Sequence, residues 1–204
     1  MNLLNMRFSS VELRDLAKAW VVISLSFAML RGGGLHFTPA FVISAIISAV
    51  TVGVGFLLHE LMHKYFAQKY GCRAEFRAFD IMLLIAFGLA LSRSPIFFAA
   101  PGAVFISGNA NLARSGRISA AGPVTNIVLA AAFIAVAFAA RFFPAPALLL
   151  QVASYGASIN AWLAVFNMLP FMGLDGSKVM YWNMKVYASL LALSILMMVL
   201  AAVV

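Results

Sequence analysis

The stretch Phe41–His63, FVISAIISAVTVGVGFLLHELMH, decides the fold of this chain. Residues 41–58 carry no charge, and ionisable residues follow directly. An apolar run of this length is typical of a helix that crosses a membrane. The helical pattern continues to Gly71, and about 30 residues at 1.5 Å per residue give a rod of about 45 Å, longer than the hydrocarbon core of a bilayer. We therefore expect the last turns of this helix, with their ionisable side chains, to emerge into the interface.

The composition of the whole chain agrees with a membrane protein. Of its 204 residues, 64% are hydrophobic and 10% are charged, and the mean hydropathy is +1.01. Soluble domains are about half apolar and one quarter charged, so a soluble enzyme is excluded, as is a cleaved signal peptide ahead of one. The net charge of +8 comes mostly from short loops between apolar runs, which suits lipid headgroups better than nucleic acid. The single cysteine, Cys72, excludes an internal disulfide and a multi-cysteine zinc site.

The apolar runs predict an all-α membrane protein with about five transmembrane helices in a single domain, residues 1–204. The predicted helices are 13–31, about 41–70, 125–140, 148–169 and 186–204. Between the second and third lies an apolar stretch, 79–108, that is split at Ser92–Pro95 and again at Pro101-Gly102. Its halves are too short to span as helices, so we expect a re-entrant, membrane-embedded hairpin, for which β structure is one option; a kinked spanning helix is the alternative.

The distribution of basic residues predicts the topology. With five spans and the N-terminus inside, the inside loops collect eleven Lys and Arg, namely Arg7, Arg14, Lys18, Lys64, Lys69, Arg73, Arg77, Arg114, Arg117, Lys178 and Lys185. Arg31 and Arg141 fall outside. By the positive-inside rule, the N-terminus and the end of the second helix are cytoplasmic. The chain is thus expected to be a multi-pass integral protein, and a prokaryotic cell membrane is the expected location.

The sequence His59-Glu60-Leu61-Met62-His63 is the strongest chemical signal. Residues four apart project from one face of a helix, so the two imidazoles can hold one cation while Glu60 reaches water beside it. The alternative is that these side chains only solvate a helix end. Ionisable residues in a membrane helix are costly and are usually functional, which favours the metal site.

A catalytic zinc ion normally takes three protein ligands, so a third must come from elsewhere. Glu75 and Asp80 have Arg73 and Arg77 as natural ion-pair partners. Asp175 follows the fourth predicted helix, on the same side of the membrane as the two histidines. Helix-breaking residues precede it, and we expect Gly176 to allow a tight turn there.

Three motifs of the chain resemble the site-2 proteases, which are intramembrane zinc metalloproteases. The first is the HExxH sequence at His59–His63, the second is NxxPxxxxDG at Asn167–Gly176, and the third is the GPxxN element at Gly122–Asn126. Together they cover the second, third and fourth predicted helices, which form the core of that family. The PDZ and CBS domains of many relatives are absent, so we expect a minimal transmembrane core.

The resemblance implies one zinc ion per chain, with His59, His63 and Asp175 as ligands and Glu60 as the general base. It suggests that Asn167 binds substrate backbone or the developing oxyanion; a contact between helices is the alternative. Asn126 is a further candidate for that role, although we expect it mainly to be an interhelical partner. The implied partners are the lipid bilayer and a membrane-anchored protein substrate cut within or near its transmembrane segment, in regulated intramembrane proteolysis. The oligomeric state is not predicted.

A substrate helix must unwind before its peptide carbonyl can react, because each carbonyl is held in the helical hydrogen-bond ladder. We therefore expect an extended substrate, which adds to a strand edge in the predicted hairpin around Met82–Ile106. Two other functions compete with proteolysis. An ion or small-solute transporter could use His59, Glu60 and Asp175, but it has no need for a glutamate between two ligating histidines. An inactive scaffold is disfavoured by the intact motifs.

Overall fold

The computed structural model describes residues 2–3, 6–35, 38–94, 101–108, 110–171 and 173–204. The elements in chain order are β1 Asn2–Leu3, β2 Met6–Arg7, α1 Ser10–Gly32, α2 Pro39–Ser48, η1 Ala49–Gly53, α3 Val54–Lys69, β3 Arg73–Ala78, α4 Asp80–Leu91, β4 Gly102–Ser107, α5 Leu112–Ala139, α6 Ala147–Asn167, α7 Asp175–Trp182 and α8 Met184–Ala201. Apart from two small antiparallel strand pairs, β1–β2 and β3–β4, these elements are helical. The predicted all-α membrane protein is therefore confirmed.

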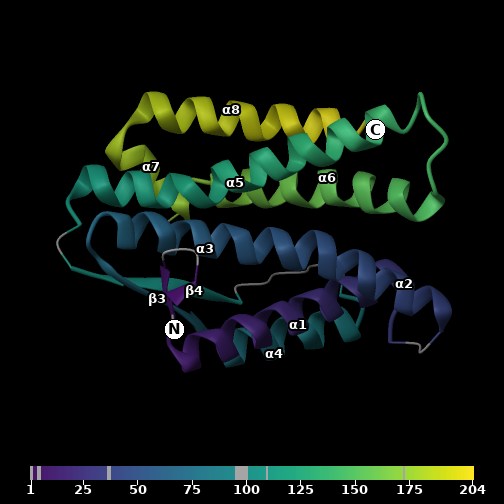
Figure 1. Ribbon diagram of the computed structural model, residues 1–204, viewed down its shortest axis with the longest axis horizontal. Helices are drawn as coiled ribbons and strands as arrows, with labels where there is room; N and C mark the ends of the chain where they lie inside the picture. The colour runs from purple at the N-terminus through teal and green to yellow at the C-terminus, as the bar shows by residue number, and fades with distance from the viewer. Residues whose placement is uncertain (1, 4–5, 36–37, 95–100, 109, 172) are drawn as a thin grey trace.

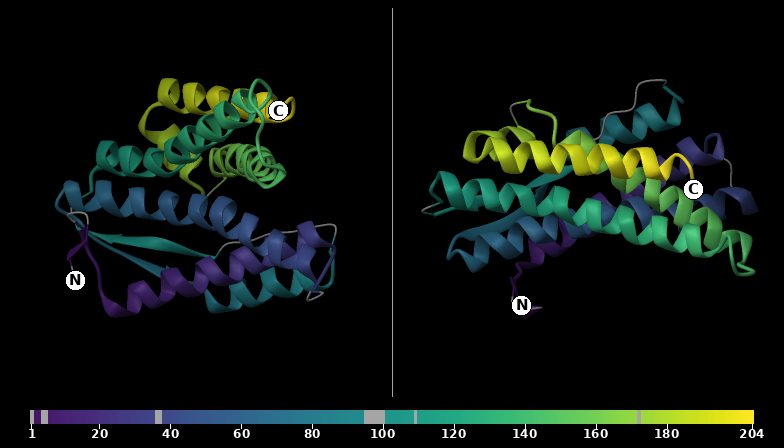
Figure 2. Two further views of the ribbon diagram at one scale, coloured as in Figure 1. Left: turned by 45° about the vertical axis from the view of Figure 1, so that its right-hand side comes forward. Right: turned by 90° about the horizontal axis from the view of Figure 1, so that it is seen from above.

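The helices form three layers with the α2–α3 rod in the middle (Figure 1). One side of the rod is covered by α1, on which α4 packs, and the other by α5 and α6, on which α8 packs (Figure 2). The start of α1, the end of α3, the start of α5 and the short helix α7 all lie at the same end of the bundle, where β3 and β4 also lie (Figure 1). The polar end of the rod is therefore surrounded by elements from both outer layers.

Within the ranges that the structure describes, four helical segments are long and apolar enough to cross a membrane: 39–69, 112–139, 147–167 and 184–201. Helix α1 also forms, close to its predicted range, and its 23 residues are long enough to span. It differs in that Glu12, Arg14, Asp15 and Lys18 lie in its first turns and Arg31 lies in its last turn. By length and composition, four segments thus qualify rather than the five that the sequence predicts.

The central rod is continuous, but it contains one wide turn, the π-helical segment η1. A π turn leaves main-chain carbonyls out of the regular helical ladder. The indole Nε1 of Trp20 in α1 donates to the carbonyl of Ala49 at 3.2 Å, and Thr51 Oγ1 donates to the carbonyl of Ile47 at 2.6 Å. Gly53 permits this approach, since a Cβ there would lie 2.5 Å from the indole nitrogen. The wide turn is therefore joined to α1 by a side chain.

The predicted hairpin is partly wrong. Residues 80–91 form the 12-residue helix α4, and the strand β4 that follows pairs with β3, which precedes α4. The register runs from Arg73 opposite Ser107 to Ala78 opposite Gly102. Neither a strand at Met82 nor a kinked spanning helix forms, because 12 residues reach only about 18 Å. The break after Leu91 is where the sequence indicates it, and residues 95–100 of the predicted hairpin lie outside the described residues.

Two further boundaries differ from prediction. Helix α5 begins at Leu112 rather than near Thr125, and Pro123 lies inside it. A proline within a helix removes one hydrogen bond to the residue four before it, which bends a helix more often than it ends one in a membrane. Asp175 is the first residue of α7 rather than part of a turn. The positive φ that marks a turn is found at Gly173, not at Gly176.

A buried ion pair fixes the junction of α1, α3 and β3. Lys64 Nζ donates to Glu12 Oε2 and to the carbonyl of Ala74, both at 2.8 Å, and Glu12 Oε1 accepts the main-chain N–H of Phe76 at 2.9 Å. Both charged side chains are almost fully buried. A buried pair persists when further hydrogen bonds satisfy its remaining donors and acceptors. This contact ties α1 and the strand pair to α3, one residue after His63.

Candidate metal centre

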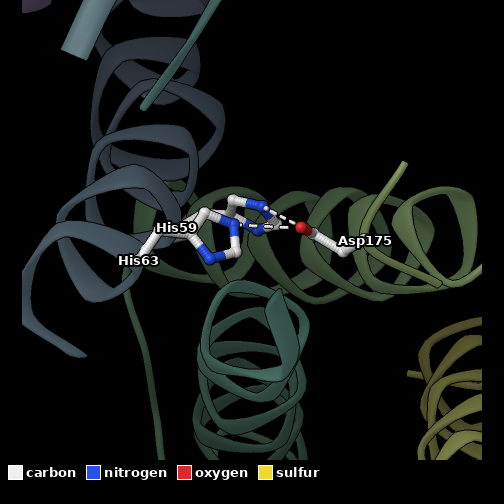
Figure 3. A group of neighbouring side chains, drawn as sticks. All are labelled: His59, His63 and Asp175. Atoms are coloured by element: carbon white, nitrogen blue, oxygen red, sulfur yellow. Dashed lines mark hydrogen bonds and ion pairs between the residues drawn. The ribbon is translucent and has the colours of Figure 1, made fainter. Parts of the chain in front are cut away.

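Two histidines of α3 and one aspartate of α7 converge on one point (Figure 3). Because His59 and His63 are four residues apart, both rings project from the same face of the helix. Their Nε2 atoms lie 3.2 and 3.1 Å from the same oxygen, Oδ2 of Asp175. All three side chains are buried, and their nearest ligand atoms lie within 4.8 Å of one another. The residues that the sequence nominates as ligands are therefore brought together.

The other ring nitrogen of each histidine is held by a fixed acceptor. His59 Nδ1 donates to Oδ1 of Asn126 at 2.6 Å, and His63 Nδ1 donates to the carbonyl of Ile118 at 2.8 Å. The orientation of the Asn126 amide is set by its own donor, which contacts the carbonyl of Gly55 at 3.3 Å and Oδ1 of Asn160 at 3.0 Å. With Nδ1 as the donor, a neutral imidazole presents a bare lone pair at Nε2.

In their neutral form, the two imidazole rings therefore direct the lone pairs of their Nε2 atoms at the carboxylate of Asp175. Two acceptors at about 3 Å repel one another unless a proton or a metal cation lies between them. Three nitrogen and oxygen ligands with second acceptors fixing the rings are typical of catalytic zinc. Ligand atoms around a tetrahedral zinc ion lie about 3.3 Å apart, given metal–ligand distances of about 2.0–2.1 Å. The separations of Asp175 Oδ2 from the two nitrogens fit that spacing.

Gly122 of α5 leaves the space beside these nitrogens free of side-chain atoms. A Cβ at this position would lie 2.5 Å from Nε2 of both His59 and His63. Gly176 acts in a similar way in α7, because a Cβ there would lie 2.4 Å from the carbonyl oxygen of Met168. The close packing of α7 against the end of α6 therefore depends on this glycine, and with it the position of Asp175.

The electrostatics at Asp175 favour its charged form. Burial alone raises the pKa of this carboxyl, but the positive charge of His63 and the hydrogen bonds of His59 and His63, when these rings carry a proton at Nε2, outweigh burial and hold the pKa below its ordinary value. A carboxylate that stays ionised is the form that binds a metal ion.

Glu60 lies beside the cluster at the wall of a cavity of about 250 Å³. It is 9% exposed, and its Oε2 has no hydrogen-bond partner among the described residues. Its carboxylate lies within hydrogen-bonding reach of the main-chain N–H of Val104 in β4. A buried carboxylate oxygen without a partner is costly unless water or a ligand completes it. Glu60 is therefore placed to contact a molecule that enters the cavity.

The remaining predicted residue, Asn167, also lines this cavity, at the end of α6. Its amide nitrogen donates to the carbonyl of Leu163 in its own helix at 2.9 Å. Asn126 reaches the cluster through His59, as the hydrogen bonds above show. Asn160, which sequence reasoning missed, orients Asn126 from the neighbouring helix. The sequence feature that could have identified Asn160 is its place in the middle of an apolar helix, where a polar side chain must find a partner.

The fold and the site define an α-helical membrane protein with a buried cluster of two histidines and one carboxylate whose ligand atoms are close enough to hold a metal ion. The chain is 39% identical over 183 residues to "Putative zinc metalloprotease MJ0611" of Methanocaldococcus jannaschii, a match that covers 89% of this chain and 90% of that protein. It is 31% identical over 131 residues to "Putative zinc metalloprotease Rip3" of Mycobacterium tuberculosis, covering 64% of this chain and 29% of Rip3. No protein-family model and no solved structure matches the sequence. The chain belongs to the zinc metalloprotease family of these relatives, in agreement with its resemblance to site-2 proteases.

Proposed function

We propose that this protein is an intramembrane zinc metalloprotease of the site-2 type, with one zinc ion held by His59, His63 and Asp175. The observation that carries the proposal is the convergence of both Nε2 atoms and one carboxylate oxygen beside the unpartnered Oε2 of Glu60. The position of the cluster on a segment long enough to span a membrane supports hydrolysis at membrane depth.

Glu60 is the general base in this proposal. Bound zinc would polarise the scissile carbonyl and lower the pKa of water towards about 7. Glu60 accepts the proton of the attacking water at Oε2 and then delivers it to the nitrogen of the leaving amine. Asn126 keeps the His59 ring oriented, while Asn167 offers its amide to the substrate backbone or the oxyanion.

The substrate binds as an extended segment beside β4. Residues Gly102–Val104 and Ile106 line the cavity, and the antiparallel register with β3, in which Phe79 N–H donates to the carbonyl of Pro101, leaves the main-chain N–H of Val104 directed away from β3. A strand edge of this kind can pair with an unwound peptide. The expected strand edge thus lies at 102–107, because Leu83–Leu91 belong to the helix α4.

The aromatic side chains of the cavity favour an apolar segment of a membrane-anchored protein as the substrate. Phe27, Phe56, Phe79, Trp162 and Phe166 line it together with aliphatic residues. We further propose that the N-terminus and the site face the cytoplasm of a prokaryotic cell, as the basic residues indicate. We also propose that its substrates are membrane-anchored regulators, which it cleaves in regulated intramembrane proteolysis.

The test uses the full chain in liposomes with a single-pass test protein whose transmembrane segment carries a central Asn-Pro pair. We expect one zinc per chain and a cut within or beside that segment. Glu60→Gln should retain zinc and lose cleavage, and Asp175→Ala should lose both. Wild-type protein without zinc, or cleavage that persists in Glu60→Gln, would contradict the proposal. Ion flux through the liposomes without cleavage would instead support a transporter.

A further inference from the structure

A second and larger cavity lies outside the metal centre. It is a cleft of about 880 Å³ between the β2–α1 junction, the last turns of α3 and the start of β3. The wall combines aromatic side chains, Phe8 and Tyr65, with three cations, Arg7, Lys69 and Arg73. The proposed protease chemistry uses none of these residues.

The cations of this cleft carry charge that its own acids do not offset. Two acids line the cleft, and both are engaged elsewhere. Glu12 forms an ion pair with the buried Lys64. Glu75 forms an ion pair with Arg77 at 3.1 Å and accepts a hydrogen bond from the hydroxyl of Ser9. In the part of the chain that the structure describes, no carboxylate lies within ion-pair distance of Arg7, Lys69 or Arg73. The cleft therefore has an excess positive charge from three side chains.

The shape of the cleft is maintained by contacts that leave those cations available. The side-chain amide of Gln68 binds both main-chain groups of Arg7, accepting its N–H at 2.9 Å and donating to its carbonyl at 3.2 Å. The guanidinium of Arg7 is thus not needed to hold the N-terminal segment on α3. Lys69 lies 5.9 Å from the centroid of the Tyr65 ring and 5.7 Å from that of Phe66, an arrangement that keeps its ammonium at the end of α3.

The place of the cleft identifies the class of ligand. Lys69 is the last residue of the span 39–69, so the cleft lies at the polar end of this segment, where we expect its last turns to emerge into the membrane interface. Basic pockets between membrane helices at this level bind the phosphate groups of anionic lipids. We propose that the cleft binds the phosphate-bearing headgroup of an anionic membrane lipid through Arg7, Lys69 and Arg73. Its floor, the Glu12–Lys64 pair, adjoins His63, which places the lipid next to the end of the metal-binding helix.

The test measures lipid retention by the purified full chain in detergent, with native mass spectrometry. Phosphatidylglycerol is added at matched amounts against phosphatidylcholine of the same acyl chains. The variant Arg7→Gln/Lys69→Gln/Arg73→Gln removes the cations of the cleft. The matched control is Arg14→Gln/Arg117→Gln/Lys185→Gln, which removes equal charge from the first turns of α1, α5 and α8 at the same end of the bundle (Figure 1). Melting temperature and zinc content check that each variant folds.

We expect the wild type and the control to prefer phosphatidylglycerol. Each cation should contribute about fivefold, which corresponds to about 1 kcal/mol per basic residue near an anionic surface, so the cleft variant should lose on the order of a hundredfold. Equal retention by all three proteins would overturn the proposal. Inorganic phosphate or an acidic peptide that binds the cleft while phosphatidylglycerol does not would also overturn it, in favour of a soluble anion. Individual single-charge variants preserve the test if the triple variant fails to fold.

Discussion

Gly122→Ala gives the sharpest test of the metal centre, because it adds one methyl group at the point where the two histidines meet. The new Cβ would lie 2.5 Å from Nε2 of His59, 2.5 Å from Nε2 of His63 and 2.6 Å from Cε1 of His59. Ordinary contacts between such atoms begin near 3.5 Å, so each ring nitrogen must move by about 1 Å. The atoms that yield are the ends of side chains, so the rings are displaced rather than the helices.

The expected effect on zinc binding follows from that displacement. Metal sites tolerate ligand shifts of about 0.2 Å, and a movement about five times larger should lower zinc affinity by at least about 100-fold. The fold should persist, since alanine is favoured over glycine in a helix by up to about 1 kcal/mol. Gly122→Ala should therefore keep its melting temperature in the presence of chelator and lose its metal.

The assay is zinc content per chain after equilibration with graded concentrations of a chelator. Gly88→Ala is the matched control, because Gly88 is also helical and a Cβ there meets no atom within 4 Å. This control should bind zinc like the wild type. If Gly122→Ala bound zinc with unchanged affinity, the Nε2 atoms would not be the ligating atoms and the assignment of the site would fail.

Three further predictions concern the surroundings of the site. Asn126→Ala removes the acceptor of His59 Nδ1 and should lower zinc affinity by about 10–100-fold in the same chelator assay; unchanged affinity would contradict its role in orienting the ring. Val104→Pro removes the N–H directed to the cavity, so it should abolish cleavage while zinc is retained, whereas Val104→Ala should cleave; equal activity of the two would exclude strand pairing at β4. Lys64→Met leaves Glu12 buried without its cation and should cost about 3–5 kcal/mol of stability, part of which Lys64→Met/Glu12→Gln restores; thermal unfolding measures both, and no difference between them would show that the pair is not coupled.

The sequence predicts the helix that carries the site because its signal is local. A long apolar run defines the rod, and the four-residue spacing of His59 and His63 fixes their common face. Asp175 is found through its position after the fourth predicted helix, although the local structure expected there is wrong. The sequence predicts a tight turn at Gly176, whereas in the structure Gly176 lies in α7, which packs against Met168.

Other features depend on contacts between distant segments and leave weak local signals. The pairing of β3 with β4 joins strands on both sides of α4, and neither strand is separable from its apolar surroundings by composition. The sequence does not indicate that α5 begins as early as Leu112, because Arg114, Arg117 and Pro123 are residue types that are common in loops. Asn160 acts on His59 only through the packing of α3, α5 and α6, which no spacing in the sequence reveals, and the GPxxN element includes Gly122 without revealing its contact with the histidines.

The hydrogen bond between Trp20 and the wide turn of the central rod gives the protein an internal optical probe. The indole of Trp20 in α1 contacts the rod at Ala49, which lies ten residues before His59 in the chain. Among the three tryptophans of the chain, Trp20 can be isolated as Trp162→Phe/Trp182→Phe. Loss of its bond to Ala49 would change the surroundings of the ring and therefore the wavelength of its fluorescence emission. Movement of the first helix away from the central rod would thus be visible in real time without an added dye.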